Sequence, residues 1–359
     1  MRIGIVTFQE TNNYGAILQN YALQKALIKL GHSPETIDYR SEYIAKPYRL
    51  RHLRDKGMRK WLLGIIGYLV YLPRTRKNKL FRQLIKYSPI VDINNIDSLN
   101  DIYDIFIAGS DQVWNCGLTG GDPVYMLGFV DDRDKCFAYA ASIGAEHILR
   151  DWIELYKSYI SSFNRISVRE GCVIREMENL LSRADICRMP DPLVLLSRDE
   201  WDEVAVTPSL NEPYIYVYQL GVSSLLVEMA DNLAREHNCK LVFSPFPVGR
   251  LSRGYYDISA GCGEVVGYIR NAEYVLTDSF HGTLMSIIYG KKFYTYSGGT
   301  HSAVGSRIND MLKQYGLETR LIEKTKSDDV IDYSYTDSIL VSERKMAYEY
   351  LNSIIRTEG

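Results

Sequence analysis

Short apolar runs alternate with amphipathic segments along most of this chain, and this alternation limits the folds that the sequence can adopt. The first half opens with the apolar run RIGIVTF (2–8), continues through an amphipathic segment at 16–31 and reaches a second strand-like run at 33–39. The second half begins in the same way, with strand-like runs at 213–221 and 239–246 flanking an amphipathic segment at 223–238. Alternating strands and helices predict parallel sheets that are covered by helices on both faces.

The length of the chain favours two such domains. At 359 residues it exceeds what one hydrophobic core usually holds. We therefore expect an α/β fold with two Rossmann-like parallel-sheet domains that face each other across a cleft. The expected parts are a first domain at 1–195 with a basic and apolar insertion at about 45–88, a second domain at 196–336, and a helix at 337–359 that packs back towards the first domain.

Polar residues follow the predicted strands, at the edge where ligands bind in open α/β sheets. The polar or glycine-bearing stretches are 11–15, 110–115, 142–144, 169–170 and 278–281. His281 is expected near a helix N-terminus, where free N–H groups and the helix dipole favour an anion, and Ser279 is expected to cap that helix. A capping or packing role for His281 remains the alternative.

Two arginines are candidate anion ligands. Arg169 follows the predicted strand at 165–168, and its planar guanidinium suits a carboxylate or a phosphate. The alternative is an ion pair between Arg169 and Glu170 or another neighbour. Arg307 is expected at the start of a further amphipathic helix, where an arginine is often only solvated.

Several protein classes are disfavoured by the sequence. Asp38 lies where a ribose-binding acid would lie, but the first loop lacks the G-x-G-x-x-G pattern, and no Walker A lysine loop occurs. No cluster has metal-ligand spacing, so we assign no metal. A net charge of −2 gives no argument for nucleic acid. Six scattered cysteines without a C-x-x-C pair and an N-terminus unlike a signal peptide favour a cytoplasmic protein.

Residues 49–86 break the even charge balance. Twelve lysines and arginines there face a single acid, Asp55, and they flank the apolar run Trp61–Pro73. This run is too short to span a bilayer. A basic, apolar segment of this kind is typical of peripheral contact with an anionic membrane, here the inner face of the membrane. The alternative is a core helix that is flanked by solvated bases.

These stretches together resemble the polysaccharide pyruvyl transferase family. The matching stretches run in order over most of the chain, whereas 41–100 matches no motif; they are NNYGAILQNYALQKAL (12–27), FIAGSDQVWN (106–115), AYAASIGA (138–145), ISVRE (166–170), DPLVLL (191–196), NAEYVLTDSFHGTLMSIIYGKKF (271–293) and SRINDML (306–312). The TDSFHGT block within its NA-x-YV lead-in is the most specific of them.

The resemblance implies a GT-B-like fold and a known reaction. Members of the family typically take pyruvate from phosphoenolpyruvate and attach it to a sugar as a ketal, releasing phosphate, in exopolysaccharide or capsule biosynthesis. No cofactor is implied, because phosphoenolpyruvate is the donor substrate. The sugar acceptor is expected on a lipid carrier if residues 49–86 contact the membrane.

The resemblance also implies roles for particular residues. It makes Arg169 a donor-binding residue, His281 a catalytic or phosphate-contacting residue and Arg307 a second basic ligand. Our hypothesis is that Arg169 and Arg307 clamp the anion and that His281 is the general acid or base. The candidate substrate-binding residues are Asn13, Tyr14, Gly15, Ser110, Asp111, Asn115, Gly144, Ser279 and Gly282, of which Asn13 and Asp111 are candidates for sugar hydroxyls.

One departure from the family leaves other functions open. Where other members often carry Arg-Leu-His, this chain has Ser279, Phe280 and His281. One alternative is a GT-B glycosyltransferase with a nucleotide-sugar donor, whose base and ribose would contact Tyr14, Tyr216 and Tyr218. Another is a non-catalytic partner of a membrane assembly, which would bind lipid through residues 49–86.

Overall fold

The computed structural model describes residues 1–45, 58–221, 223–245, 254–298, 302–324 and 331–355, which form two compact units. The first unit comprises Met1–Val70, Arg82–Leu195 and Glu343–Gly359, and the second comprises Tyr71–Phe81 and Leu196–Ser342. The first division thus falls after Leu195, where the sequence places it. The last helix divides at Glu343, later than the expected 337, and Tyr71–Phe81 of the insertion groups with the second unit.

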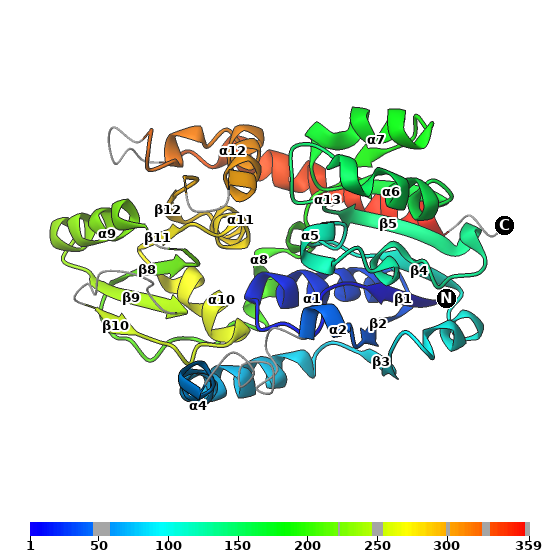
Figure 1. Cartoon of the computed structure of the whole chain (residues 1–359). Helices are drawn as coiled ribbons and strands as arrows, with labels where there is room; N and C mark the ends of the chain where they lie inside the picture. Colours follow the sequence, from blue (N-terminus) through cyan, green and yellow to red (C-terminus); the bar gives the residue numbers. More distant parts are fainter. Residues whose placement is uncertain (46–57, 222, 246–253, 299–301, 325–330, 356–359) are drawn as a thin grey trace. The chain divides into compact units, whose positions relative to one another are not determined.

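The first unit is built on a seven-stranded sheet in the order β3-β2-β1-β4-β5-β6-β7 (Figure 1). Every neighbouring pair of strands is parallel. The strands are β1 (Arg2–Val6), β2 (Ser33–Tyr39), β3 (Tyr87–Val91), β4 (Ile105–Ala108), β5 (Cys136–Ala141), β6 (Arg165–Val168) and β7 (Cys187–Arg188). The predicted parallel α/β sheet is therefore confirmed.

Helices cover both faces of this sheet because its central strands are apolar on both sides. Ile105 and Ile107 of β4 pack on one face, and Phe106 and Ala108 pack on the other. The first face is covered by α1 (Tyr14–Lys29) and by the last helix, α13 (Ser334–Ile355). The second face carries α6 (Ile153–Ile160) and α7 (Ile174–Leu181), and the unit also contains the short helices α2 (Glu42–Ala45) and α5 (Cys116–Thr119).

The second unit is built on a five-stranded parallel sheet in the order β10-β9-β8-β11-β12. Its strands are β8 (Tyr214–Gln219), β9 (Lys240–Pro245), β10 (Tyr255–Tyr256), β11 (Tyr274–Thr277) and β12 (Lys292–Thr295). Helix α9 (Ser224–Glu236) packs on one face of this sheet. The other helices of this unit are α8 (Arg198–Asp202), α10 (Cys262–Asn271), α11 (Phe280–Ile288) and α12 (Ser302–Tyr315).

Within the predicted basic and apolar insertion at about 45–88, residues 58–82 form helix α4 (Met58–Arg82), with Pro73 inside it, whereas residues 46–57 lie outside the described residues. Within the second unit, Lys77 Nζ lies 2.8 Å from Glu264 Oε1, and Asn78 Oδ1 accepts a hydrogen bond of 3.0 Å from Cys262 N. Asn78 is fully buried. This part of the basic segment is thus packed on protein. Among the helices of the described residues, none has the length and apolar character needed to cross a membrane.

Candidate functional site

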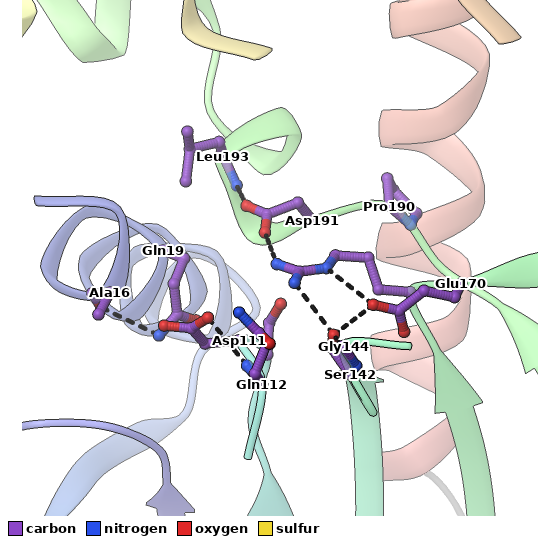
Figure 2. Close-up of polar contacts among 12 residues, drawn as sticks. Ala16, Gln19, Asp111, Gln112, Ser142, Gly144, Glu170, Pro190, Asp191 and Leu193 are labelled. Carbon is purple, nitrogen blue, oxygen red and sulfur yellow. Dashed lines mark hydrogen bonds and ion pairs between the residues drawn. The ribbon is translucent and has the colours of Figure 1, made fainter. Parts of the chain in front are cut away.

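Polar side chains gather at the carboxyl ends of β1, β4, β5 and β6 in the first unit (Figure 2). Most come from residues within three positions of a strand end, so the parallel sheet brings them to one edge, whereas Gln19 reaches this edge from helix α1. We call this group the Arg169 cluster; its members are Gln19, Ser110, Asp111, Ser142, Arg169, Glu170 and Asp191. All seven residues are buried, and Ser110 and Gln19 have no exposed surface.

Arg169 lies at the centre of this cluster with three partners. One of its terminal nitrogens is 2.8 Å from Asp191 Oδ2, and the other donates a hydrogen bond of 3.1 Å to Ser142 Oγ. Arg169 Nε lies 3.8 Å from Glu170 Oε1, and the Ser142 hydroxyl donates to the same oxygen. The expected alternative for Arg169, an ion pair with Glu170, is thus present, together with a stronger pair with Asp191.

The charges around Arg169 are mostly negative. Burial lowers the pKa of Arg169, but Glu170, Asp191 and Asp111 raise it by more, so the guanidinium is held charged. One positive charge therefore lies among three carboxylates. A further anion at Arg169 would have to compete with these carboxylates.

The backbone beside Arg169 is fixed by two unusual residues. Asp111 has a φ of 74°, and its carbonyl oxygen accepts a hydrogen bond of 3.1 Å from Ser142 N. Gly144 has a φ of 71°, and a Cβ there would lie 2.1 Å from Gln112 Oε1. Gln112 Oε1 in turn accepts a hydrogen bond of 2.9 Å from Asn115 Nδ2. Gly144 is needed because it leaves room for this amide pair, which is half-buried.

Asn13, Tyr14 and Gly15 lie at the N-terminus of helix α1. Asn13 is the N-cap of α1, and its side chain accepts a hydrogen bond from Ala16 N. Tyr14 and Gly15 are buried in the first turn of α1. The proposed contacts of these three residues with a sugar stay predictions.

The second unit brings Asp278, Ser279, Phe280, His281 and Gly282 to the strand-to-helix junction between β11 and α11. Ser279 is the N-cap of α11, and its hydroxyl accepts a hydrogen bond of 3.2 Å from Gly282 N. His281 is the second residue of the helix. The predicted cap and the predicted position of His281 at a helix N-terminus are both confirmed. Gly282 is needed for packing, because a Cβ there would lie 2.6 Å from Thr277 Oγ1.

Asp278 closes the turn that follows β8. Its two carboxylate oxygens accept hydrogen bonds from Leu220 N at 2.6 Å and from Gly221 N at 2.7 Å. Burial raises the pKa of Asp278, and the hydrogen bonds from these two backbone groups offset part of that rise. The backbone donors of this turn, which precedes helix α9, are thus occupied by a side chain of the protein itself.

Arg307 supplies a cation beside α11. The guanidinium carbon lies 5.8 Å from the centre of the Phe280 ring, and that ring makes an edge contact with the His281 ring at 5.4 Å between centroids. Contact at this distance is typical of a cation–π interaction. The prediction that Arg307 begins a helix is wrong, because α12 begins five residues earlier, at Ser302. Arg307 and His281 belong to the second unit, and Arg169 belongs to the first.

The tyrosines invoked for a nucleotide base are core residues. Tyr14, Tyr216 and Tyr218 are at most 2% exposed. The Tyr216 ring stacks on Tyr268 of α10 at 5.1 Å, and a Cβ at Gly282 would touch Tyr218. Their role in the nucleotide-sugar alternative is therefore contradicted by their burial.

Four residues of the Arg169 cluster were not named as candidate site residues from the sequence. Ser142 and Glu170 at least lie in the polar stretches that follow predicted strands, whereas Asp191 and Gln19 do not. Asp191 lies in the DPLVLL stretch, where only its approach to Arg169 in space reveals it. Gln19 lies inside α1, beside the buried residues Asn20 and Gln24. Three polar residues within an otherwise apolar helix are a signal that could have found it. Among the described residues, no group of His, Cys, Asp and Glu has an arrangement that could hold a metal ion.

The two helix-covered parallel sheets define an α/β protein with two Rossmann-like units of the GT-B-like class. Residues 13–299 match the family described as polysaccharide pyruvyl transferase, and the chain therefore belongs to this family. Membership makes the protein a transferase and supports a role in polysaccharide pyruvylation. No curated protein sequence matches the chain.

Solved structures are similar to this chain at low sequence identity. A UDP-GlcNAc 2-epimerase from Neisseria meningitidis bound to UDP-GlcNAc is 11% identical with a TM-score of 0.50, covering 98% of this chain and 100% of that one. The UDP-GlcNAc 2-epimerase from Methanocaldococcus jannaschii is 12% identical with a TM-score of 0.48, covering 97% and 93%. The Streptomyces sp. SF2575 glycosyltransferase SsfS6 is 12% identical with a TM-score of 0.41, covering 99% and 100%.

Proposed function

We propose that this protein transfers pyruvate from phosphoenolpyruvate to sugar hydroxyls as a ketal, in exopolysaccharide or capsule biosynthesis. The observation that carries the proposal is the family match, which includes the strand-to-helix junction that holds His281. In this reaction, the methylene carbon of phosphoenolpyruvate gains a proton and a sugar oxygen attacks the central carbon. Phosphate leaves, and a second sugar hydroxyl closes the ketal.

The second unit offers groups that suit the donor. The first turn of α11 presents the positive end of a helix dipole, and Arg307 adds a full charge beside Phe280. We assign the binding of the anionic donor to this region, with Arg307 as its cationic ligand and His281 as the residue that moves a proton. Arg169 stays a predicted donor ligand, but its existing pairs with Asp191 and Glu170 favour Arg307 for this role.

One contact argues against a nucleotide-sugar donor. In open α/β sheets, phosphate groups bind backbone N–H groups at the turn between a strand and the following helix. At the turn after β8, the N–H groups of Leu220 and Gly221 already bind the Asp278 carboxylate. A nucleotide phosphate would have to displace Asp278 to bind there.

Calorimetric titration of phosphoenolpyruvate, uridine diphosphate and guanosine diphosphate tests the donor. We expect saturable binding of phosphoenolpyruvate alone. Arg307→Ala should weaken it by roughly 10- to 150-fold, because a hydrogen bond to a charged group contributes about 1.5–3 kcal/mol. Lys313→Ala, which removes an exposed charge from the same helix, is the control. Nucleotide binding without phosphoenolpyruvate binding would refute the proposed donor.

We further propose that the acceptor sugar is lipid-linked and that α4 contacts the membrane surface. Leu69 and Leu80 on this helix are 59% and 62% exposed, and Arg76 and Lys79 are exposed beside them. Apolar groups next to bases bind anionic lipid surfaces. The double variant Leu69→Gln, Leu80→Gln should release the protein from sedimenting vesicles of phosphatidylglycerol. Leu118→Gln and Leu149→Gln, at exposed leucines elsewhere, should not; wild-type protein that does not sediment would disprove the contact.

A further inference from the structure

Two aromatic side chains of the first unit lie against consecutive glycines. The glycines, Gly120 and Gly121, follow α5 and have positive φ angles of 68° and 71°. A Cβ on Gly120 would lie 2.6, 2.7 and 2.8 Å from three neighbouring ring atoms of Tyr43, and a Cβ on Gly121 would lie 2.6 Å from the Trp152 ring. Only glycine lets the backbone approach both rings this closely. We call Tyr43 and Trp152 the aromatic pair.

Tyr43 presents one face of its ring to the backbone and the other to solvent. The three ring atoms are almost equally far from the Cβ position of Gly120, so this glycine lies against the face of the ring and not against its edge. Tyr43 is nevertheless 55% exposed. Trp152 is half-buried, because part of its side chain packs on the core of the unit. The aromatic pair thus combines firm support from beneath with accessible ring surface.

The aromatic pair lies at the edge of the sheet where ligands bind in this class of fold. Tyr43 follows β2, the two glycines follow β4, and Trp152 follows β5. The carboxyl ends of these parallel strands meet at one edge, which also carries the Arg169 cluster. Because consecutive Cα atoms are about 3.8 Å apart, the nearest atoms of the two rings lie within about 12 Å of each other. A short oligosaccharide is long enough to contact both.

The chemistry of the aromatic pair favours a saccharide. The apolar C–H face of a sugar ring packs on an aromatic face, and the burial of apolar surface on both partners stabilises the contact. Within the described residues, neither the Tyr43 hydroxyl nor the Trp152 indole N–H is buried or hydrogen-bonded, so both can bond to sugar hydroxyls. One exposed tyrosine is ordinary, whereas two aromatic side chains seated on adjacent glycines at this edge form a surface that the fold constructs.

We propose that the aromatic pair binds the acceptor saccharide, at sugar units next to the one that receives pyruvate. This assignment rests on the proposed pyruvyl transfer and names the part of the protein that holds its neutral substrate. It makes no use of the Arg169 cluster, so Arg169 remains available to the donor. A chain of several sugars should bind more tightly than a single sugar, because only the chain reaches both rings.

Saturation-transfer nuclear magnetic resonance on the full chain tests the class of ligand. The panel contains the methyl glycosides of glucose, galactose, mannose and N-acetylglucosamine, with one trisaccharide of each sugar. We expect at least one trisaccharide to bind more tightly than its methyl glycoside, with the strongest transfer to C–H protons of the sugar rings. Failure of every trisaccharide to bind would refute the proposal.

Variants of the aromatic pair test its part in this binding. Tyr43→Ala should weaken trisaccharide binding by roughly 2- to 13-fold, and Tyr43→Phe, which keeps the ring, should weaken it less. Trp152→Leu, which keeps an apolar side chain for the core, should weaken it as Tyr43→Ala does. Tyr335→Ala is the matched control, because Tyr335 is 57% exposed and also lies against a glycine, Gly316, in the second unit. Equal binding by wild type and Tyr43→Ala would contradict the proposal.

Titration of phosphoenolpyruvate on the same variants separates this inference from the proposed donor. We expect Tyr43→Ala and Trp152→Leu to leave phosphoenolpyruvate binding unchanged. Trisaccharide binding that depends on Tyr43, in a protein that does not bind phosphoenolpyruvate, would support the saccharide site and refute the donor. Analytical ultracentrifugation covers the remaining use of exposed aromatic rings: an oligomer that Tyr43→Ala dissociates would make the aromatic pair a contact between copies of the chain and overturn the proposal.

Discussion

At the scale of single residues, the two arginines singled out from the sequence lie in very different surroundings. Arg169 is paired with Asp191 and Glu170, whereas Arg307 stacks on Phe280 beside His281. Both are less than one-tenth exposed. Replacing each arginine should therefore have different consequences: loss of Arg169 leaves carboxylates buried without a cation, and loss of Arg307 removes positive charge next to a helix N-terminus.

Arg169→Ala should destabilise the protein by about 3–5 kcal/mol, because removal of one partner from a buried ion pair leaves an uncompensated charge. The free energy of unfolding in urea is the measurement. Arg175→Ala, at an exposed arginine of α7, should change it by less than about 0.5 kcal/mol. A loss below 1 kcal/mol for Arg169→Ala would contradict the structural role. For this reason, ligand binding by Arg169→Ala must be read together with its stability.

His281→Ala should lower turnover by roughly 10²- to 10⁴-fold, the range for loss of a general acid or base. The measurement is phosphate release from phosphoenolpyruvate in the presence of a glycoside that binds the protein. His237→Ala, next to the end of α9, is the control histidine. Full activity of His281→Ala in a folded protein would remove His281 from the mechanism.

The sequence predicted which residues follow the strands, but it did not predict the contacts between residues that are distant in the chain. Ser279, His281 and Arg169 directly follow predicted strands, so local pattern and the geometry of parallel sheets were enough to place them. The partnership of Arg169 with Asp191 depends on a contact between residues 22 positions apart, and no periodicity in the sequence encodes it. The burial of Tyr216 in strand β8 also depends on packing, here against Tyr268 of helix α10.

At the scale of elements, long apolar strands were predicted and short or interrupted ones were missed. Strands β1, β4, β5, β8 and β11 follow their apolar runs closely. Strand β3 was missed because Pro89 lies inside it, and a proline usually argues against a strand unless it lies at a sheet edge. β3 is such an edge. Strands β7 and β10 have two residues each, which is too few for a pattern.

Helix α10 receives a hydrogen-bond acceptor for its first turn from another helix, α4. Its N-cap is Gly261, which has no side chain to bind the free N–H groups of the first turn. Asn78 of α4 supplies that acceptor, at 3.0 Å from Cys262 N. The insertion that matched no sequence motif thus stabilises the start of a helix in the second unit.

Asn78→Ala should lower the free energy of unfolding by about 1–2 kcal/mol, because it removes a buried capping acceptor. Asn78→Asp should lose less, since it keeps an acceptor and places negative charge at a helix N-terminus. Lys79→Ala, the exposed neighbour on α4, serves as the control. Equal unfolding midpoints in urea for all three variants would show that the cap contributes nothing.

At the scale of the whole molecule, neither unit is one continuous stretch of chain. The first unit includes the C-terminal part of α13. The buried residues of this part pack in the core with β1, β4 and β5. Tyr350 also donates a hydrogen bond of 2.8 Å to the carbonyl oxygen of Ala138. The stability of the first unit should thus depend on residues at the far end of the sequence.

Leu351→Ala should destabilise the protein by about 2–5 kcal/mol, the usual range for truncating a fully buried leucine. Val341→Ala on the same helix, where the side chain is 63% exposed, should change the free energy of unfolding by less than about 0.5 kcal/mol. Urea denaturation of both variants makes the comparison. Similar effects from the two would show that α13 does not complete the core.

The packing of α13 on the sheet of the first unit also has a consequence during synthesis on the ribosome. Strands β1, β4 and β5 leave the exit tunnel early, yet one face of their sheet lacks one of its two covering helices until α13 has been translated. Apolar surface of this kind binds chaperones and promotes aggregation while the nascent chain is incomplete. A stop codon between Asp191 and α13 therefore leaves a first unit whose sheet is partly uncovered, even though every residue of the Arg169 cluster has been made.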